Sequence, residues 1–379
     1  MENYGLTTVA EFLGDLLIYR NLQPIDHRLP GFREVAARIG LGGPTIPRKS
    51  EPTYARIVAF LLQRARALEP GASKIQRLVY IGDTRMNDGI AFANLCEAGK
   101  WPGIAFIGSE SEQPEQVELV AEAQRTLYLA NRWAMLRDFH RYCSEHEFPI
   151  DDSTAVVIDL DKTALGARGR NDRMIDQARV VAVRETVETL LGDAFNRAAF
   201  EASYDLLNRT EFHPFTADNQ DYLAYVCLIL GSGLISRDKL VEKIRSGELK
   251  HFTEFLASVD ATASDLPETL RELHSDIHTR VRSGDPTPFK AFRYNEYVMT
   301  VQRMGHLDPK APAKELLAHE IVITQEVRQA ALAWLEQGAL IFALSDKPDE
   351  ASIPAPELVA RGYRPIHRTP THAVGTQAR

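Results

Sequence analysis

Cysteine is scarce in this chain: only three occur among 379 residues, at Cys96, Cys143 and Cys227. Their number is odd, they lie far apart, and none belongs to a Cys-x-x-Cys or mixed Cys/His pattern. This usage argues against a disulfide framework and leaves a zinc site without support. It is typical of proteins kept in a reducing cytosol, so we expect a cytoplasmic location.

The chain also lacks an excess of basic residues and a long apolar run. Asp and Glu outnumber Lys and Arg by 52 to 44, so the formal net charge of −8 gives no basic field and nucleic acid is not an expected partner. The longest uncharged stretch, Tyr222–Ser236, is shorter than the roughly 20 apolar residues of a membrane helix. It predicts a buried helix, and we expect no membrane partner. The N-terminal residues include Glu2, Glu11 and Asp15, and we expect no signal peptide.

What the chain does have is an ordinary globular composition, with 44% apolar and 25% charged residues, enough for two domains or one elaborated one. The composition specifies no oligomeric state. Four short, nearly continuous apolar runs predict parallel strands buried on both faces: Leu78–Ile81, Gly103–Ile107, Ala155–Ile158 and Leu340–Leu344. Helical patterns lie between them, one opening at Pro52 and another closing at Gly338. Such alternation predicts an α/β fold with a doubly wound, mostly parallel, Rossmann-like sheet.

Between Arg173 and Ala318 helical faces recur and no convincing strand is visible, which indicates a helical insertion between two sheet strands. The stretch Pro114–Phe148 is also mostly helical in pattern. We therefore predict four segments, namely an N-terminal helical lead (1–45), a first core part (46–163), a helical cap (164–320) and a second core part (321–379).

The most informative run is Val156–Thr163, in which a β-branched strand ends on Asp159 and Asp161. Two like charges so close repel unless a cation or a hydrogen-bond network offsets them, and such sites are usually functional. Asp83 and Ser345 also follow apolar strands, and the carboxyl ends of parallel strands share one edge of a sheet. Converging carboxylates favour a hard cation with oxygen ligands, so we expect Mg²⁺.

These residue types suit phosphoryl transfer. A carboxylate beside Mg²⁺ can attack phosphorus and form an aspartyl-phosphate. A second carboxylate can protonate the leaving oxygen and then deprotonate the attacking water. Ser345 and a lysine would supply a hydrogen bond and positive charge to the phosphoryl oxygens.

Four motifs resemble those of the haloacid dehalogenase-like phosphatases. Asp159-Leu160-Asp161-Lys162-Thr163 is similar to the first motif, Leu344-Ser345-Asp346-Lys347-Pro348 to the second, Lys49-Ser50-Glu51-Pro52 to the third, and Gly82-Asp83-Thr84-Arg85-Met86-Asn87-Asp88 to the fourth. In the family they run from first to fourth, whereas here the third and fourth precede the first and second. The resemblance therefore implies a circularly permuted core, in which the tail Pro365–Arg368 forms the strand after the second-motif helix. It also implies that the helical insertion is the family's cap.

The resemblance implies a Mg²⁺-dependent phosphomonoester hydrolase that acts on a small phosphorylated metabolite. Asp159 would be the nucleophile and Asp161 the general acid and base, while Ser345 and Lys49 hold the phosphoryl oxygens. The metal ligands would be Asp159, the backbone carbonyl of Asp161, and Asp83, with Asp88 as a supporting candidate.

Several alternatives stay open at this point. Lys74 or Lys347 could replace Lys49, and Asp88 could merely cap a helix. Five further residues are candidates for substrate contact, with ordinary surface or packing roles as the alternative: Thr163, Arg168, Arg170, Lys290 and Arg293. Two competing functions stay open. One is a phosphomutase or phosphotransferase of the same fold, and the other is a non-catalytic scaffold that binds a phospholigand.

Overall fold

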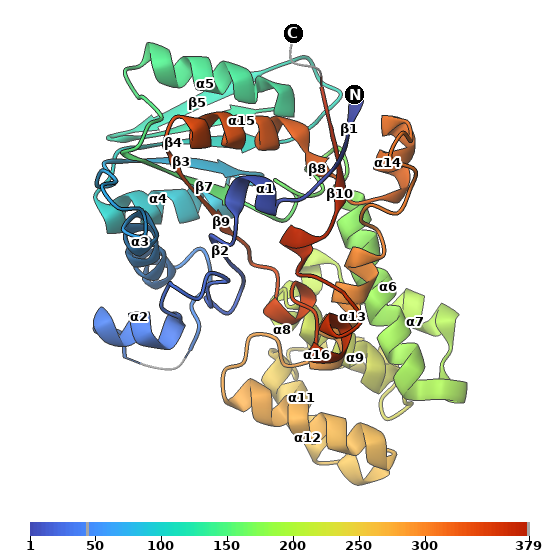
Figure 1. Cartoon of the computed structure of the whole chain (residues 1–379). Coiled ribbons are helices and arrows are strands. Elements are labelled where there is room, and N and C mark those ends of the chain that lie inside the picture. The colour runs from blue at the N-terminus through green and yellow to red at the C-terminus, as the bar shows by residue number, and fades with distance from the viewer. Residues whose placement is uncertain (43–44, 377–379) are drawn as a thin grey trace. The chain divides into compact units, whose positions relative to one another are not determined.

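The computed structural model describes residues 1–42 and 45–376. The chain divides into two compact units (Figure 1). The core unit comprises Met1–Gln177 and Thr300–Arg379, and the helical unit comprises Ala178–Met299. The helical unit is thus a shorter segment than the expected cap of residues 164–320.

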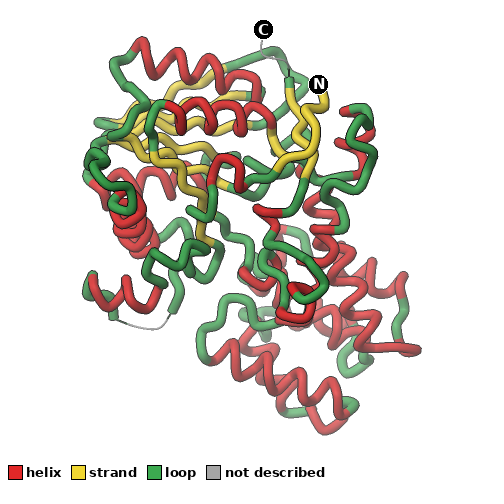
Figure 2. The backbone as a smooth tube through the Cα atoms, viewed as in Figure 1, coloured by secondary structure: helices red, strands yellow, loops and turns green. Residues whose placement is uncertain are grey.

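A seven-stranded sheet organises the core unit (Figure 2). Its strands, in spatial order, are β2 (Leu17–Ile18), β9 (Leu340–Leu344), β7 (Thr154–Asp159), β3 (Arg77–Gly82), β4 (Gly103–Gly108), β6 (Arg125–Ala130) and β5 (Val117–Glu122). All neighbours pair in parallel except β5 and β6, which are antiparallel. The expected α/β class with a mostly parallel sheet is confirmed, and so are the four apolar runs as strands.

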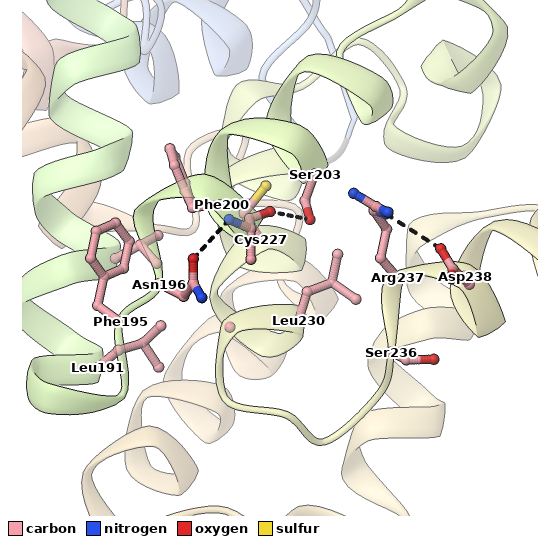
Figure 3. Close-up of a pocket in the computed structure, with 13 residues that line it drawn as sticks. Leu191, Phe195, Asn196, Phe200, Ser203, Cys227, Leu230, Ser236, Arg237 and Asp238 are labelled. Atoms are coloured by element: carbon pink, nitrogen blue, oxygen red, sulfur yellow. Dashed lines mark hydrogen bonds and ion pairs between the residues drawn. The ribbon is translucent and has the colours of Figure 1, made fainter.

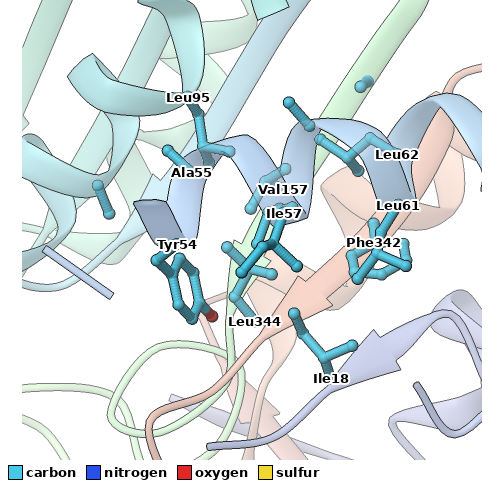
Figure 4. Packing of buried hydrophobic residues seen from close by; sticks show 14 of the residues in the cluster. Ile18, Tyr54, Ala55, Ile57, Leu61, Leu62, Leu95, Val157, Phe342 and Leu344 are labelled. Atoms are coloured by element: carbon cyan, nitrogen blue, oxygen red, sulfur yellow. The ribbon is translucent and has the colours of Figure 1, made fainter. Parts of the chain in front are cut away.

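Helices cover both faces of this sheet (Figure 1). On one face lie α3 (Pro52–Arg66) and α4 (Asn87–Gly99), with α2 (Phe32–Arg38) packed against α3, and on the other α1 (Ala10–Leu13), α5 (Leu136–Glu145) and α15 (Gln325–Glu336). The first face buries every second residue of the central strands, since Val157 and Phe342 pack with Ile57 and Leu61 of α3 (Figure 4). Because both faces are covered, the central strands are apolar throughout.

A second, three-stranded sheet joins the two ends of the chain. Its order is β1 (Glu2–Thr7), β10 (Thr371–Gly375) and β8 (Ile323–Thr324), with β1 antiparallel and β8 parallel to β10. The N-terminal segment is therefore not the helical lead expected for residues 1–45, because β1 and β2 both enter sheets. Both pair with strands near the other end of the chain, so no local pattern could indicate them.

Two further expectations are wrong. Pro114–Phe148 is not mostly helical, since β5 and β6 form a hairpin there before α5 begins. β6 pairs with β4 and so extends the sheet beyond the predicted strands. The tail Pro365–Arg368 is not a strand but contains a 3₁₀ helix, Ile366–Arg368, and the strand that follows it, β10, belongs to the small sheet.

The helical unit contains no strand in residues 178–299, all of which the structure describes. α6 (Asp172–Leu191) leads into it and α13 (Lys290–Val301) leads out; between them lie α7 (Arg197–Leu207), α8 (His213–Thr216), α9 (Gln220–Gly231), α10 (Arg237–Arg245), α11 (Phe252–Asp260) and α12 (Glu268–Arg282). The predicted buried helix at Tyr222–Ser236 is largely α9, whose Tyr225 packs on Phe252 and Phe255.

The remaining helices of the core unit are short, α14 (Ala313–His319) and α16 (Pro356–Val359). None of the helices in residues 1–42 and 45–376 combines the length and apolar character needed to cross a membrane.

Candidate functional site

Three strands deliver polar residues to one edge of the main sheet. β7 ends on Asp159, Asp83 follows the end of β3, and Ser345 follows the end of β9. The register pairs Asp159 with Leu344 on one side and Ile158 with Ile81 on the other. The three side chains are therefore neighbours at the carboxyl edge, as the strand pattern predicted.

Lys49 joins this edge from the loop before α3. Its side chain is 4% exposed, and its Nζ donates to Asp159 Oδ1 at 2.5 Å and to Asp88 Oδ1 at 2.8 Å. Of the two alternative lysines, Lys74 is exposed, whereas Lys347 is buried and its backbone N–H donates to Ser345 Oγ at 3.0 Å. The structure thus brings Lys49, rather than Lys74, to the carboxylates.

Asp88 is buried in the first turn of α4, and both of its carboxylate oxygens are already used. Oδ1 accepts from Lys49 Nζ and, at 3.0 Å, from the Tyr80 hydroxyl. Oδ2 accepts from the backbone N–H groups of Asp83 at 3.0 Å and Thr84 at 2.9 Å. Asp88 therefore fixes the loop after β3 and orients Lys49, which is more than a helix cap would do.

Gly82 is what allows Asp88 to come so close to the loop. A Cβ at this position would lie 2.5 Å from both Cβ and Cγ of Asp88, which is too close for a non-bonded contact between carbon atoms. The glycine in the Gly82-Asp83 pair is thus required for close approach of a side chain, not for an unusual backbone angle.

The carboxylates of Asp83, Asp88 and Asp159 form a compact group, with one oxygen of each lying within 4.8 Å of the others. Oxygen donors in such a cluster suit Mg²⁺. Because the hydrogen bonds of Asp88 occupy its oxygens, Asp83 and Asp159 are the side chains best placed to hold the ion. Asp161 follows in the turn after β7, where it is half-buried and Lys162 adopts a left-handed conformation with φ of 65°.

The electrostatics of this group reflect a shortage of positive charge. Burial raises the pKa of Asp159 well above its usual range, against the opposing effect of Lys49, and the Asp88 and Asp83 carboxylates raise it further. Burial and Asp88 also raise the pKa of Asp83, to about 7. Burial alone would lower the pKa of Lys49, but Asp159 and Asp88 raise it well above its usual range. A divalent cation would relieve the repulsion that these shifts reflect.

Arg168 lies at the same site and Arg170 does not. The Arg168 Nε donates to Asp83 Oδ2 at 2.5 Å, and its side chain is 36% exposed. Arg170 is 3% exposed and pairs with Glu326 and Glu110, both at 2.8 Å. Both arginines were candidates for substrate contact from the sequence. In the structure the ion pairs of Arg170 favour a structural role for it.

Three buried hydroxyl groups of the core unit have no hydrogen-bond partner, those of Thr163, Tyr54 and Ser352, and the first two belong to segments that carry site residues. Thr163 belongs to the turn after β7, and Tyr54 is in the first turns of α3, shortly after Lys49. Buried hydroxyl groups are normally bonded, so these two are open to a ligand. Sequence reasoning named Thr163 but missed Tyr54 and Tyr80, because each looks like an ordinary core aromatic of a helix or strand.

Lys290 and Arg293 have acidic partners within the helical unit. The Arg293 guanidinium is buried and donates to Asp221 and Glu296, each at 2.5 Å. Lys290 Nζ lies 3.0 Å from Asp285 Oδ2. These contacts favour structural roles over the substrate contacts considered from the sequence.

The helical unit also contains a pocket of about 430 Å³ (Figure 3). Its polar side chains bond locally, with Asn196 accepting from the backbone N–H of Ala199 and Ser203 donating to the Ala199 carbonyl. Burial raises the pKa of the Cys227 thiol, so it is not a thiolate at neutral pH. Its charged lining residues, Arg237 and Asp238, pair with each other at 3.5 Å, so the pocket holds no buried carboxylate cluster like that of the core site.

No family model, curated protein or solved structure significantly matches this chain.

Proposed function

We propose that this protein is a Mg²⁺-dependent phosphomonoester hydrolase of the haloacid dehalogenase-like type. The observation that carries the proposal is the 2.5 Å contact between Lys49 Nζ and Asp159 Oδ1. A buried ammonium held against a strand-end carboxylate is suited to receive the phosphoryl oxygens of a substrate that this carboxylate attacks.

In the proposed reaction an Asp159 oxygen attacks phosphorus, the ester P–O bond breaks, and Asp161 donates a proton to the leaving oxygen. Asp161 then takes a proton from water, whose oxygen attacks the aspartyl-phosphate and releases inorganic phosphate with Asp159 restored. The position of Asp161 in the turn after β7 supports this division of roles.

The remaining groups would bind and orient. Lys49 and the Ser345 hydroxyl face the phosphoryl oxygens, while Asp88 positions Lys49 through the bond at 2.8 Å. Asp83, Asp159 and the Asp161 carbonyl would hold Mg²⁺, which neutralises charge on the phosphoryl group when bound. Asp88 is thus assigned to positioning rather than to the metal.

The strand order supports the permuted arrangement. β9, β7 and β3 are adjacent, and they carry the residues that resemble the second, first and fourth motifs. Lys49, which belongs to the segment that resembles the third motif, contacts Asp159 although it precedes Asp159 in the sequence. The helical unit lies between β7 and β9 in the sequence, where the family carries a cap, and we assign it that role.

The test is hydrolysis of a panel of phosphomonoesters with and without Mg²⁺. Asp159→Asn should abolish turnover, whereas the exposed Asp193→Asn should leave it unchanged. Beryllofluoride, which mimics a phosphoryl group on a carboxylate, should bind the wild type and not Asp159→Asn. An Asp159→Asn variant with the wild-type rate would refute the nucleophile assignment.

The same panel separates the competing functions. Transfer of the phosphoryl group to a second substrate, with little release of phosphate, would indicate a phosphomutase or phosphotransferase. Phosphoester binding without turnover would indicate a scaffold.

A further inference from the structure

A second cluster of potential metal ligands lies in the helical unit and has no part in the proposed phosphatase site. It consists of Asp260, the last residue of α11, with His274 and His278 of α12. The two histidines are four positions apart, so they lie on the same face of α12, one turn from each other. One ligand atom of each residue lies within 4.8 Å of the others.

His274 is already oriented in the way that protein metal ligands are. Its side chain is 2% exposed, its ring stacks on that of Tyr225, and its Nδ1 lies 2.6 Å from the Tyr225 hydroxyl. A histidine that binds a metal through one ring nitrogen usually has the other held by a hydrogen bond, which fixes the tautomer and the ring.

The other nitrogen of His274, Nε2, is buried and makes no hydrogen bond. It faces Asp260, whose Oδ1 lies 3.4 Å away, and the same Oδ1 lies 3.7 Å from His278 Nδ1. A buried ring nitrogen without a well-formed hydrogen bond is costly, because it has lost its bonds to water. A bound metal ion would satisfy it.

The spacing agrees with tetrahedral coordination. Zinc bonds to histidine nitrogen and carboxylate oxygen are about 2.0–2.1 Å long, so the ligand atoms of a tetrahedral site lie about 3.3–3.4 Å apart. The distances of 3.4 and 3.7 Å from Asp260 require little adjustment. The Asp260 side chain is 59% exposed, which leaves an entry path and room for water as a fourth ligand.

We propose that Asp260, His274 and His278 bind a divalent transition-metal ion of the zinc class. Two imidazoles and one carboxylate favour such an ion over Mg²⁺ or Ca²⁺, which prefer oxygen ligands throughout. The ion would link the end of α11 to the middle of α12 across their connecting turn. The site contains no cysteine, so the cysteine usage of the chain, which gave a zinc site no support, does not bear on it.

The experiment is Zn²⁺ titration of the full-length protein in competition with a chromophoric chelator, with excess Mg²⁺ present to occupy the core site. Wild-type protein should bind one Zn²⁺ ion that His278→Gln and Asp260→Asn bind at least tenfold more weakly. Both side chains are partly exposed, at 28% and 59%, so these variants should fold.

His213→Gln is the matched control, because His213 lies in the same unit and its Nε2 is also 3.7 Å from a carboxylate oxygen, that of Asp218, with no third ligand. It should bind Zn²⁺ as the wild type does. Zn²⁺ should also raise the unfolding temperature of the wild type and of His213→Gln, but not of His278→Gln. Equal Zn²⁺ affinity in the wild type and His278→Gln would overturn the proposal, as would no Zn²⁺ binding in the presence of Mg²⁺.

Discussion

Lys49 Nζ lies 2.5 Å from Asp159 Oδ1, although 110 positions separate the two residues. α3 begins at Pro52, shortly after Lys49, and packs against the face of the sheet that includes Val157 of β7. The loop before α3 is thereby held at the edge where β7 ends. Taking an ammonium and two carboxylates out of water is expensive, and perturbed carboxylates gathered at the edge of a sheet mark a candidate functional site.

Replacing Lys49 with methionine should abolish hydrolysis and also destabilise the protein. The variant leaves Asp159 and Asp88 buried without their cation, and breaking a buried ion pair costs about 3–5 kcal/mol. Urea unfolding and steady-state rates measure the two effects. Lys74→Met, at an exposed lysine, is the control and should change neither. An active Lys49→Met enzyme would exclude this lysine from the site.

Asp88→Asn should lower the turnover rate while changing Mg²⁺ affinity little. An amide nitrogen cannot accept the hydrogen bonds that one of the two Asp88 oxygens now receives, so at least two buried donors lose their acceptor. Each loss costs about 1–3 kcal/mol, and the rate falls by about 5- to 160-fold if that cost is borne by the transition state through displacement of Lys49.

Asp83→Asn provides the contrast, since Asp83 is proposed to bind the ion directly. It should weaken Mg²⁺ binding at least tenfold, as measured by calorimetry or by the Mg²⁺ dependence of the rate. If instead Asp88→Asn weakens Mg²⁺ binding as much as Asp83→Asn does, then Asp88 is a metal ligand and not a positioning residue.

The structural elements that could be predicted from the sequence are those whose residue pattern follows from burial of the element itself. β9 runs from Leu340 to Leu344 as predicted, because a strand covered on both faces must be apolar at every position. β1 was missed because only alternate residues of it are partly buried and its partner β10 is at the other end of the chain. Asp83, Asp159 and Ser345 were recognisable as candidates because each stands at or directly after the end of such a strand.

The residues that support the site were not recognisable in this way. Tyr80 looks like one more apolar strand residue, and only its position in three dimensions shows that its hydroxyl reaches Asp88. The role of Asp260 with His274 and His278 likewise depends on how α11 and α12 pack. Side-chain partners brought together by tertiary packing leave no periodic signal.

Gly82→Ala should destabilise the fold and reduce activity together. The added methyl would collide with Asp88 at 2.5 Å, and relieving such overpacking typically costs about 1–3 kcal/mol. Gly42→Ala is a suitable control, because a Cβ there has nothing within 4 Å. Thermal unfolding and the rate of hydrolysis should both separate the two variants, and wild-type values for Gly82→Ala would mean that the loop after β3 can move without consequence.

The neighbouring arginines Arg168 and Arg170 should respond in opposite ways to replacement by glutamine. Arg170→Gln breaks the buried contacts with Glu326 and Glu110 and should lower the free energy of unfolding by about 3–5 kcal/mol. Arg168→Gln removes a partly exposed side chain from Asp83 and should change the rate and Mg²⁺ affinity with less than about 1 kcal/mol of destabilisation. Equal destabilisation by both would contradict this division.

The Arg170–Glu326 pair should also make stability depend on pH in the acid range. Burial alone would raise the pKa of Glu326, but the bidentate bond from Arg170 and the backbone N–H of Thr376 lower it below its ordinary 4.5. A carboxylate whose pKa is lower in the folded state stabilises that state above its ordinary pKa, and the stabilisation is lost as the pH falls through the folded-state value. The difference in unfolding free energy between the wild type and Glu326→Gln should therefore be largest near pH 7 and shrink below about pH 4. Urea unfolding at a series of pH values measures it, and a difference that stays constant from pH 7 to pH 3 would show that the ionised Glu326 does not stabilise the fold.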